Sequence, residues 1–438
     1  MLLSLAVENY RSFGEEFVLD MQRREFKTLR PSKGESWQSQ TLRRAALLGP
    51  NAAGKSNALK PLHLLKRAVQ HSLSNPETLK TLYDPHKQHM GEPASFHVEF
   101  VQDGIRYLWF LELDATGILR EELDAVVNSR WSKAFRRNGS DVEFGQSMKI
   151  PSASKENIRA FMRPTALVLS AWTTIKDKGQ LSGALEWWAK VLPLIESNDM
   201  DQAHRHQWTI ELSQKFPSLL KTLSQTIRAA DVGVQQLSIH EQAPDAVAKF
   251  VVDFGVEPEQ VALVERLDPD DVEELFKYFV FHHSGRKGSF ELPELEESAG
   301  TRAWIDLATP ALFALAIGGI LSVDELDSSL HPFLVREIIG LFADTELNPH
   351  GAQLLFSTHD STLLGRHPEE PMERSELWII EKTDSESELI ALDEFPTRPN
   401  HNLEKQYLQG AFGAVPIAQT ISMANAIDEL RKSIAQGR

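Results

Sequence analysis

Gly49-Pro50-Asn51-Ala52-Ala53-Gly54-Lys55-Ser56 is the stretch that decides the fold of this chain. It follows the apolar segment Ala45–Leu48, which predicts a short buried strand, and it precedes a helical pattern over Asn57–Gln70. Two glycines flanking four residues, then lysine and serine, between a strand and a helix are typical of a phosphate-binding loop. The backbone N–H groups of such a loop and the helix N-terminus attract anions. The sequence therefore predicts binding of a nucleoside triphosphate at residues 49–57.

Within this loop, the chemistry of each side chain suggests a role. We expect Lys55 to reach the β- and γ-phosphates and the Ser56 hydroxyl to ligate Mg²⁺. Upstream, Asn9-Tyr10-Arg11-Ser12-Phe13 forms a turn between two predicted strands, and Arg11 could approach the nucleotide from there.

The bulk composition indicates a globular protein of two or three domains. The chain has 438 residues, of which 42% are hydrophobic and 25% charged, and it contains no cysteine. Disulfides, thiolate zinc sites and cysteine nucleophiles are thereby excluded, and a reducing cytoplasm is the expected location. The first residues lack the basic region of a secretory signal, and the longest apolar run, Pro310–Val323, is too short for a bilayer. We therefore expect no membrane partner.

The net charge of −16 argues against general nucleic-acid binding. A local basic cluster nevertheless precedes the phosphate-binding loop, and either a solvated surface loop or a patch for a phosphate backbone or a partner would explain it. Its members are Arg23, Arg24, Lys27, Arg30, Lys33, Arg43 and Arg44.

Periodicity divides the chain into an N-terminal lobe (1–150), a mainly helical insertion (151–285) and a C-terminal lobe (286–438). The first lobe contains predicted strands at 2–8 and 16–21, and an antiparallel meander at 95–102, 106–114 and 117–124. In the insertion, 181–195 and 209–228 have helical spacing, and Trp187-Trp188 is predicted to be core. The acidic residues 268–274 predict a helix start. Neighbouring histidines at 204–206 and 282–283 show no carboxylate at ligand spacing, which disfavours metal sites.

The C-terminal lobe supplies two further predicted strands with polar ends. Residues 318–325 form an apolar run that ends in Asp324 and Glu325, and we expect this strand to lie next to the strand of the phosphate-binding loop. Asp324 would hold Mg²⁺, and Glu325 would polarise the attacking water. A buried strand at 352–358 ends in His359, which could reach the γ-phosphate or the water.

Ser298 and Gly300 precede the helical residues 303–317 and predict a second anion-binding helix N-terminus. One triphosphate rarely needs two such sites in one chain. The pair is therefore expected to contact the γ-phosphate bound by a second copy, across a two-fold interface.

The order of these motifs resembles that of the ABC-type ATPases. More narrowly, Val7–Phe13, Glu297–Arg302 and Asp324–Pro332 resemble the RloA-like ATPases of bacteria, as do the tail segments 377–382, 389–395 and 410–416. That group is related to the ATPase parts of OLD-family nucleases and of the PARIS defence system, and distantly to SMC and RecF proteins. The resemblance implies an α/β ABC-type head with a mixed sheet, an antiparallel β-subdomain and an inserted helical subdomain.

The same resemblance implies an ATPase whose homodimer closes over two ATP molecules with Mg²⁺ and opens on hydrolysis. It further implies a sensor or regulator in anti-phage defence that works with a separately encoded effector, usually a Toprim-like nuclease. Nucleic acid or a phage protein is a further candidate partner, and the sequence does not identify the trigger. Transferred residue by residue, Glu325 is the base, His359 the switch histidine, and Ser298 with Gly300 the signature supplied in trans. The Q-loop glutamine stays open among Gln102, Gln146 and Gln180.

The main alternative is a DNA-clamping ATPase of the SMC or RecF type. The acidic charge and the lack of sustained heptads for coiled-coil arms weigh against it. A nuclease within the same chain is also disfavoured, because Asp393-Glu394 does not provide the second acidic motif that a Toprim domain needs.

Overall fold

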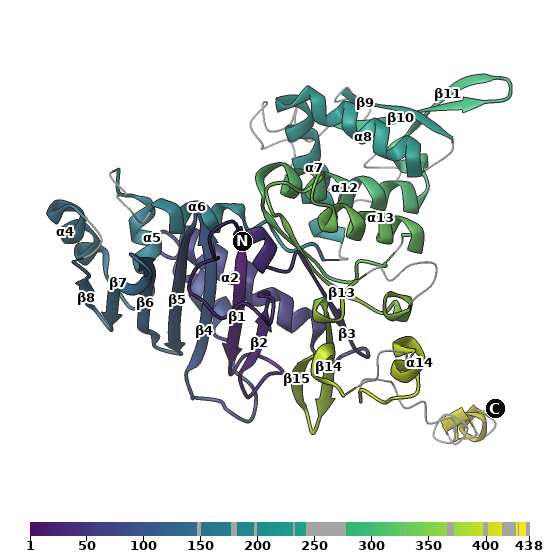
Figure 1. Ribbon diagram of the computed structural model, residues 1–438. Coiled ribbons are helices and arrows are strands. Elements are labelled where there is room, and N and C mark those ends of the chain that lie inside the picture. The colour runs from purple at the N-terminus through teal and green to yellow at the C-terminus, as the bar shows by residue number, and fades with distance from the viewer. Residues whose placement is uncertain are drawn as a thin grey trace.

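The computed structural model describes most of the chain, namely residues 1–146, 150–176, 182–196, 199–230, 233–241, 277–328, 330–365, 372–396, 402–413, 426–427 and 429–434. Three sheets and the helices around them make up this part (Figure 1). The predicted helix start at 268–274 and the candidate Gln180 lie outside the described residues.

A five-stranded sheet carries the phosphate-binding loop. Its strands lie in the order β12 (Ile320–Val323), β13 (Gln353–Thr358), β3 (Arg44–Leu48), β14 (Leu377–Thr383) and β15 (Glu386–Ala391). The first four are parallel, and β15 pairs antiparallel with β14. Every residue of β3, β12 and β13 is buried, which explains why these strands are mostly apolar rather than alternating.

The strand order corrects one prediction. The strand that ends in Asp324 does not lie next to β3, because β13 pairs with both of them and separates them. Parallel strands end at a common edge, so Asp324 and His359 still emerge on the side of the sheet where the phosphate-binding loop lies.

The predicted helices on this sheet are confirmed with small changes of length. They are α2 (Lys55–His71) and α12 (Ala299–Ile317). A further helix, α13 (Pro332–Ala343), was not predicted. Helix α12 begins after Ser298, whose side chain accepts a hydrogen bond from the Thr301 N–H, and it ends at Gly318 in the left-handed conformation (φ 65°). Helix α13 has Pro332 in its first turn, where a missing N–H costs nothing.

A seven-stranded antiparallel sheet forms the left half of Figure 1. Its order is β2 (Phe17–Asp20), β1 (Leu2–Glu8), β4 (Ala94–Gln102), β5 (Ile105–Asp114), β6 (Gly117–Val127), β7 (Arg130–Asn138) and β8 (Asp141–Phe144). The meander predicted from alternation is confirmed as β4–β6, and β7 with β8 extends it. Buried side chains of this sheet and of α2 belong to one hydrophobic cluster, so α2 joins the two sheets.

Five helices follow the antiparallel sheet: α4 (Ser152–Phe161), α5 (Val168–Thr173), α6 (Ser182–Lys190), α7 (Asp199–Lys215) and α8 (Pro217–Ala230). Trp187 and Trp188 are each 1% exposed, which confirms their predicted place in the core. The helix expected to reach Ile195 ends at Lys190, because Pro193 cannot continue it. The chain then runs along β12, and the N–H of Leu192 donates to the Ile320 carbonyl over 2.8 Å.

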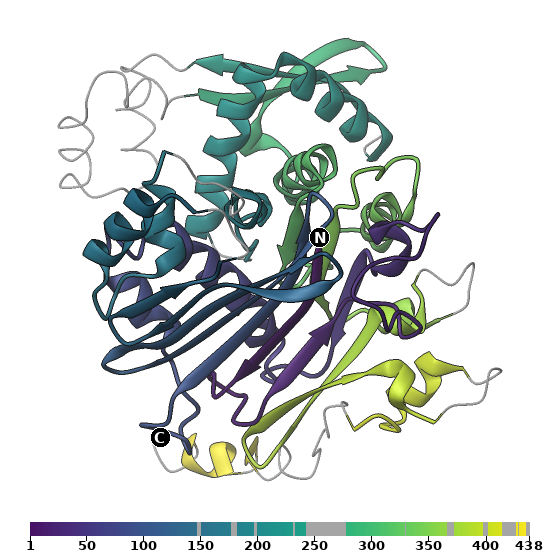
Figure 2. The ribbon, with the colours of Figure 1, turned by 60° about the vertical axis from the view of Figure 1, so that its left-hand side comes forward.

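The prediction that the insertion is helical to residue 271 is wrong where a small sheet forms. Strands β9 (Val234–Glu241), β10 (Lys277–Gly285) and β11 (Gly288–Pro293) pair antiparallel in the order β11-β10-β9 (Figure 2). Val234 and Leu237 are both buried although they are three residues apart, a helical spacing. A register shift at His282/His283 accounts for this, since a β-bulge changes which side chains share a face.

The histidines of this region have carboxylate partners, contrary to the expectation from spacing. His206 lies 3.0 Å from Glu294, and His283 lies 2.7 Å from Glu297. His282 lies 3.2 Å from Glu291 on the neighbouring strand. Sequence spacing did not reveal these pairs, because strand pairing and helix packing bring the partners together.

The basic cluster before the loop mostly contacts the C-terminal lobe. Arg23 binds Glu373 at 2.9 Å, Arg24 binds Asp393 at 2.5 Å, and the buried Arg44 binds Glu376 at 2.5 Å. These arginines therefore form salt bridges between segments that are distant in the sequence. Neither of the two explanations predicted for the cluster included this role.

Short elements complete the described chain: α1 (Trp37–Gln40), α3 (Glu77–Leu82), η2 (Glu294–Glu296), η3 (Ser361–Leu364), η4 (Arg374–Glu376), η5 (Leu392–Glu394) and α14 (Leu403–Leu408). No helix among the described residues is both long enough and apolar enough to cross a membrane.

Candidate nucleotide-binding site

The phosphate-binding loop connects β3 to α2, and two of its glycines are required by close contacts. A Cβ on Gly49 would lie 2.5 Å from the Ile380 carbonyl oxygen. Gly54 has φ 115°, and a Cβ there would lie 2.6 Å from Ser387 Oγ and 2.7 Å from Ser12 Oγ. Only glycine allows β14, β15 and the N-terminal turn to approach the loop this closely.

Lys55 is the first residue of α2, and its side chain folds back over the loop. Its Nζ donates to the carbonyl oxygens of Gly49 (2.8 Å) and Pro50 (3.1 Å). Burial lowers the pKa of Lys55, and the nearby carboxylates of Asp324, Glu325 and Asp327 oppose that shift. The ammonium group is thus held by two neutral carbonyls of the loop.

Asp324 and Glu325 follow β12 and are positioned by the buried Ser357 of β13. The Ser357 hydroxyl donates to Asp324 Oδ1 over 2.5 Å and accepts the Glu325 N–H over 2.7 Å. Glu325 has φ 54°, a left-handed conformation that is uncommon for this residue type. This sharp turn directs its side chain outward, and about half of that side chain is exposed.

His359 follows β13, beside these carboxylates. Its Nε2 lies 3.9 Å from Glu325 Oε1, and its backbone N–H donates to the Asp327 carboxylate over 3.3 Å. The histidine side chain is 37% exposed. It is therefore accessible from the same opening as Glu325.

One cleft of about 390 Å³ joins these groups, which come from three segments far apart in the sequence. It is lined by Asn51, Ala52, Gly54, Lys55, Ser56, Asn57, Asp324, Glu325 and His359. A lysine over a loop of backbone amides suits a phosphate chain, and the hydroxyl and carboxylate oxygens of Ser56 and Asp324 are the hard ligands that Mg²⁺ prefers. The donor set therefore fits a nucleoside triphosphate with Mg²⁺.

Arg11 lies behind the loop and does not line this cleft. It is held in a left-handed turn (φ 54°), its Nε binds Asp84 at 3.0 Å, and its Nη1 lies 3.4 Å from Asn57 Oδ1. Because Asn57 does line the cleft, Arg11 is placed to support the loop rather than to meet the phosphates.

Two serines that sequence reasoning missed hold the loop from outside. Ser387 Oγ donates to the Ala53 carbonyl over 2.5 Å, and Ser12 Oγ accepts from Asn57 Nδ2 over 2.9 Å. The Ser387 N–H also donates to the Ser12 carbonyl over 2.7 Å. Serines in a turn and on a strand carry no local signal, so only the fold identifies them.

Ser298 and Gly300 lie at the start of α12, away from the cleft of their own chain. Ser298 is exposed and caps the helix, while the preceding Glu297 is buried and contacts His283. Of the candidate Q-loop glutamines that the structure describes, neither Gln102 nor Gln146 lines the cleft.

A neighbouring hollow of about 250 Å³ connects the helical insertion to the same carboxylates. Arg205 of α7 and Asp306 of α12 line it together with Asp324 and Glu325. Burial raises the pKa of Asp306, and Arg205 opposes that shift. The insertion also contacts the end of β12 directly, because the Asp324 N–H donates to the Ile195 carbonyl over 2.8 Å.

A phosphate-binding loop with acidic residues and a histidine at the carboxyl edge of a mostly parallel sheet places the chain in the class of P-loop nucleotide-binding proteins. The family model described as "AAA domain, putative AbiEii toxin, Type IV TA system" matches residues 44–365. The chain belongs to this family of ATPase domains.

No curated protein matches the chain. Solved structures that match it include the SMC head domain from Thermotoga maritima, at 13% sequence identity and a TM-score of 0.39, over 89% of this chain and 98% of that one. The predicted class of fold, a mixed α/β ATPase head with an antiparallel sheet, is confirmed. The narrower RloA-like assignment stays a prediction.

Proposed function

We propose that this protein binds and hydrolyses ATP with Mg²⁺ and works as a nucleotide-dependent dimeric switch. The cleft shared by the phosphate-binding loop, Asp324, Glu325 and His359 is the observation that carries this proposal. A lysine, a hydroxyl, two carboxylates and an imidazole around one opening are the groups that phosphoryl transfer to water requires.

In this proposal each group has one task. Lys55 and the loop amides bind the phosphates, and Ser56 with Asp324 holds Mg²⁺, which neutralises charge on the phosphates. Glu325 accepts a proton from the attacking water. His359, 3.9 Å from Glu325, senses the γ-phosphate or the water.

We assign Ser298 and Gly300 to the nucleotide of a second subunit. Ser298 is exposed and Gly300 half-buried at the N-terminus of the 19-residue helix α12, which supports this assignment because such an end attracts anions. The contacts of Glu297 with His283 and with the Ser298 N–H (2.8 Å) hold this end rigidly. ATP would then form part of the interface between two copies.

For the cellular role, we propose a sensor or regulator in anti-phage defence that acts with a separately encoded Toprim-like nuclease. The motif resemblance supports this, and the family description, which refers to a toxin of a toxin–antitoxin system, is compatible with a protective role. Nucleic acid or a phage protein would be the trigger. Copurification from a host that carries the neighbouring gene tests the partner.

The switch is tested by measuring mass in solution with and without ATP. Glu325→Gln is expected to bind ATP, to stop hydrolysis and to accumulate as a dimer, because the water is no longer activated. Lys55→Ala is expected to remain monomeric with ATP. Glu337→Gln, an exposed glutamate of α13, serves as the control and should behave as wild type. A Glu325→Gln protein that still hydrolyses ATP at the wild-type rate would refute the site.

The shared site is tested by mixing two inactive variants. In a heterodimer of Lys55→Ala and Ser298→Ala, one site combines an intact loop with an intact signature from the other chain. If the signature acts in trans, a 1:1 mixture should regain about a quarter of wild-type turnover, since half the dimers are mixed and each has one intact site. A mixture as inactive as its components would show that the signature acts within its own chain.

A further inference from the structure

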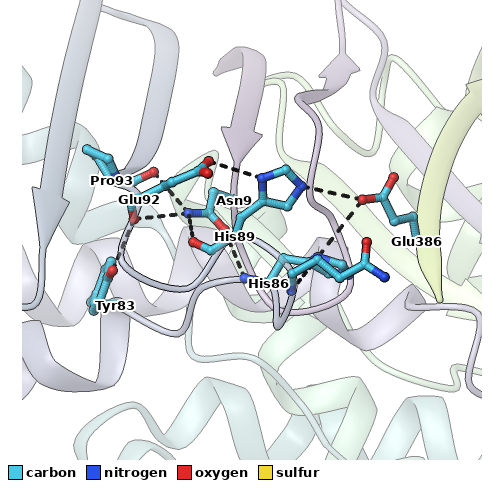
Figure 3. A network of polar contacts seen from close by, with 8 residues as sticks. Asn9, Tyr83, His86, His89, Glu92, Pro93 and Glu386 are labelled. Atoms are coloured by element: carbon cyan, nitrogen blue, oxygen red, sulfur yellow. Dashed lines mark hydrogen bonds and ion pairs between the residues drawn. The ribbon is translucent and has the colours of Figure 1, made fainter.

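Two histidines and a glutamate meet outside the nucleotide cleft, where the turn after α3 contacts β15 (Figure 3). Glu386 Oε1 lies 3.5 Å from His89 Nε2 and 3.9 Å from His86 Nδ1. Ligand atoms of the three residues all lie within 4.8 Å of one another. We propose that His86, His89 and Glu386 bind a divalent transition-metal ion, for which Zn²⁺ is the best match.

The kind and number of ligands support Zn²⁺. Two imidazoles and a carboxylate form a common zinc set, with the fourth position left to water. Nitrogen and oxygen ligands of a tetrahedral zinc ion lie about 3.3 Å apart, given bond lengths of about 2.0–2.1 Å. Glu386 lies 3.5 Å from His89 and 3.9 Å from His86, both longer than this spacing, so rotation of the side chains would bring the ligand atoms together.

The second nitrogen of each histidine already has a partner that fixes the tautomer. His89 Nδ1 lies 3.0 Å from Glu92 Oε2, and His86 Nε2 lies 3.4 Å from the Ser385 carbonyl. If these nitrogens carry the protons, Nε2 of His89 presents a lone pair toward Glu386. The lone pair of His86 Nδ1 accepts the Gln88 N–H over 3.3 Å, and binding a metal would replace that hydrogen bond. A carboxylate or carbonyl behind a ligating histidine is the usual support of metal sites.

The turn that carries the histidines is held in shape by one buried side chain. Asn9 Nδ2 donates to the carbonyls of His89, Glu92 and Pro93 at 3.1–3.2 Å, and Asn9 Oδ1 accepts the His86 N–H over 2.9 Å (Figure 3). Because the backbone is fixed in this way, both imidazoles stay near Glu386 without a metal, which lowers the entropic cost of binding.

A cation can reach this cluster through an acidic cleft. Glu386 also lines a cleft of about 950 Å³ whose other carboxylates include Glu15, Glu16, Asp384 and Glu388. Such a concentration of negative charge attracts cations and repels nucleic acid. His86 is buried, while His89 and Glu386 are half-buried, so the metal would be anchored on one side and open to the cleft on the other.

The site would connect the N-terminal lobe to the C-terminal lobe next to the phosphate-binding loop. Glu386 precedes Ser387, whose hydroxyl donates to the Ala53 carbonyl of the phosphate-binding loop. A metal bound to Glu386 and the two histidines would therefore fix β15 beside that loop. This inference stands independently of ATP hydrolysis.

The test is titration of the chelator-treated, full-length protein with ZnCl₂ against a colorimetric chelator. Excess Mg²⁺ is included to occupy the oxygen ligands of the nucleotide cleft. We expect one Zn²⁺ per chain, with affinity at least about 100-fold lower in His89→Ala and in Glu386→Gln. Glu92→Gln should bind about 10- to 100-fold more weakly, because it removes the partner of His89 Nδ1.

His282→Ala is the matched control, since His282 Nδ1 contacts Glu291 at 3.2 Å outside the cluster and its loss should not affect zinc binding. X-ray absorption at the zinc edge of the wild-type protein should show two imidazoles and an oxygen ligand, and this measurement is independent of variant stability. The proposal fails if the wild type binds no stoichiometric Zn²⁺. It also fails if both ligand variants bind as tightly as the wild type.

Discussion

The nucleotide cleft and the centre formed by Glu121 and Arg137 both contain charged side chains, but these charges have different partners. Glu121 of β6 and Arg137 of β7 are directly opposite in the antiparallel sheet, and neither is exposed. Glu121 accepts the N–H groups of Val168 and Leu169 at the start of α5, and Arg137 donates to the carbonyls of Gly139, Ala166 and Arg163. In the cleft, Lys55 donates to two loop carbonyls, and Glu325 and His359 are partly exposed.

This difference separates structural charges from functional ones. In the Glu121–Arg137 centre the protein itself supplies the hydrogen-bond partners, so the pair connects β6, β7 and α5. In the cleft the charges surround an open volume, and a ligand is needed to satisfy them. Substitutions should therefore affect stability at the first place and nucleotide chemistry at the second.

The largest expected effect is on folding, from Arg137→Met. It should lower the free energy of unfolding by about 3–5 kcal/mol, because it leaves the Glu121 carboxylate buried without its cation. Urea denaturation measures this, and ATP affinity of the folded fraction should be unchanged. Lys133→Met on the same strand is the control, since the Lys133–Glu143 pair is exposed and should contribute less than about 1 kcal/mol. Equal losses in the two variants would contradict the comparison.

The next effect is on the cleft, from Asp324→Asn. We expect Mg²⁺-dependent ATP affinity to fall about 10- to 100-fold, because a neutral amide is a weaker ligand for a hard cation. Isothermal titration with and without Mg²⁺ measures it. Asp360→Asn is the control, since Asp360 caps η3 through the Thr362 N–H. Mg²⁺-dependent binding that is unaltered in Asp324→Asn would remove this carboxylate from the metal site.

Ser357→Ala tests whether a buried side chain of the core also contributes to the chemistry of the nucleotide cleft. Ser357 is buried, yet its hydroxyl orients Asp324 and the backbone of Glu325. We expect a loss of about 1 kcal/mol in stability, together with slower ATP turnover at unchanged nucleotide affinity in the absence of Mg²⁺. Ser322→Ala, a buried serine of β12, should leave turnover unchanged. Loss of stability without any loss of turnover would make Ser357 purely structural.

The smallest effect concerns pH and the His206–Glu294 pair. Burial lowers the pKa of His206, but its hydrogen bond and charge interaction with Glu294 outweigh burial and raise the pKa above the ordinary 6.5. The folded state then binds the proton more tightly than the unfolded state. The pair thus contributes stability fully below pH 6.5, and this contribution is lost as pH rises through the raised value.

Urea denaturation of the wild type from about pH 5.5 to about pH 8.5 should show this decrease in the free energy of unfolding, because the range includes the ordinary histidine pKa. His206→Gln should flatten that part of the profile, by about 1 kcal/mol or less. ATP binding at about pH 7 should stay the same, because the His206–Glu294 pair affects stability and not the nucleotide cleft. A wild-type profile identical to that of His206→Gln would refute the contribution of the pair.

Short sequence motifs correctly predicted those parts of the site whose conformation depends on neighbouring residues in the chain. The phosphate-binding loop, the cap at Ser298 and the polar strand ends at Asp324 and His359 all lie where their motifs placed them. These features depend on backbone geometry and on hydrogen bonds between near neighbours. A continuous apolar run of four to six residues was enough to predict each buried strand.

Patterns failed where partners come from distant segments. The insertion was predicted to be mainly helical, but residues 234–241 form a strand because they pair with β10. The partners of Arg11, Asp84 and Asn57, could not be predicted from the turn that carries it, and its contact with the nucleotide stays a prediction. Ser12, Ser357 and Ser387 had no signal, because a serine becomes informative only when its hydroxyl has a partner.

The sequence alone determined that this chain has a P-loop and therefore a nucleotide-binding head. The conformation of that loop depends on residues close together in the chain, namely Gly49, Gly54, Lys55 and Ser56. Only the tertiary structure decided that β13 separates β3 from β12 and that Glu386 meets His86 and His89. Strand order and contacts between remote segments depend on packing of the whole core. That packing is a sum of many weak, non-local contacts, and no short stretch of sequence contains it.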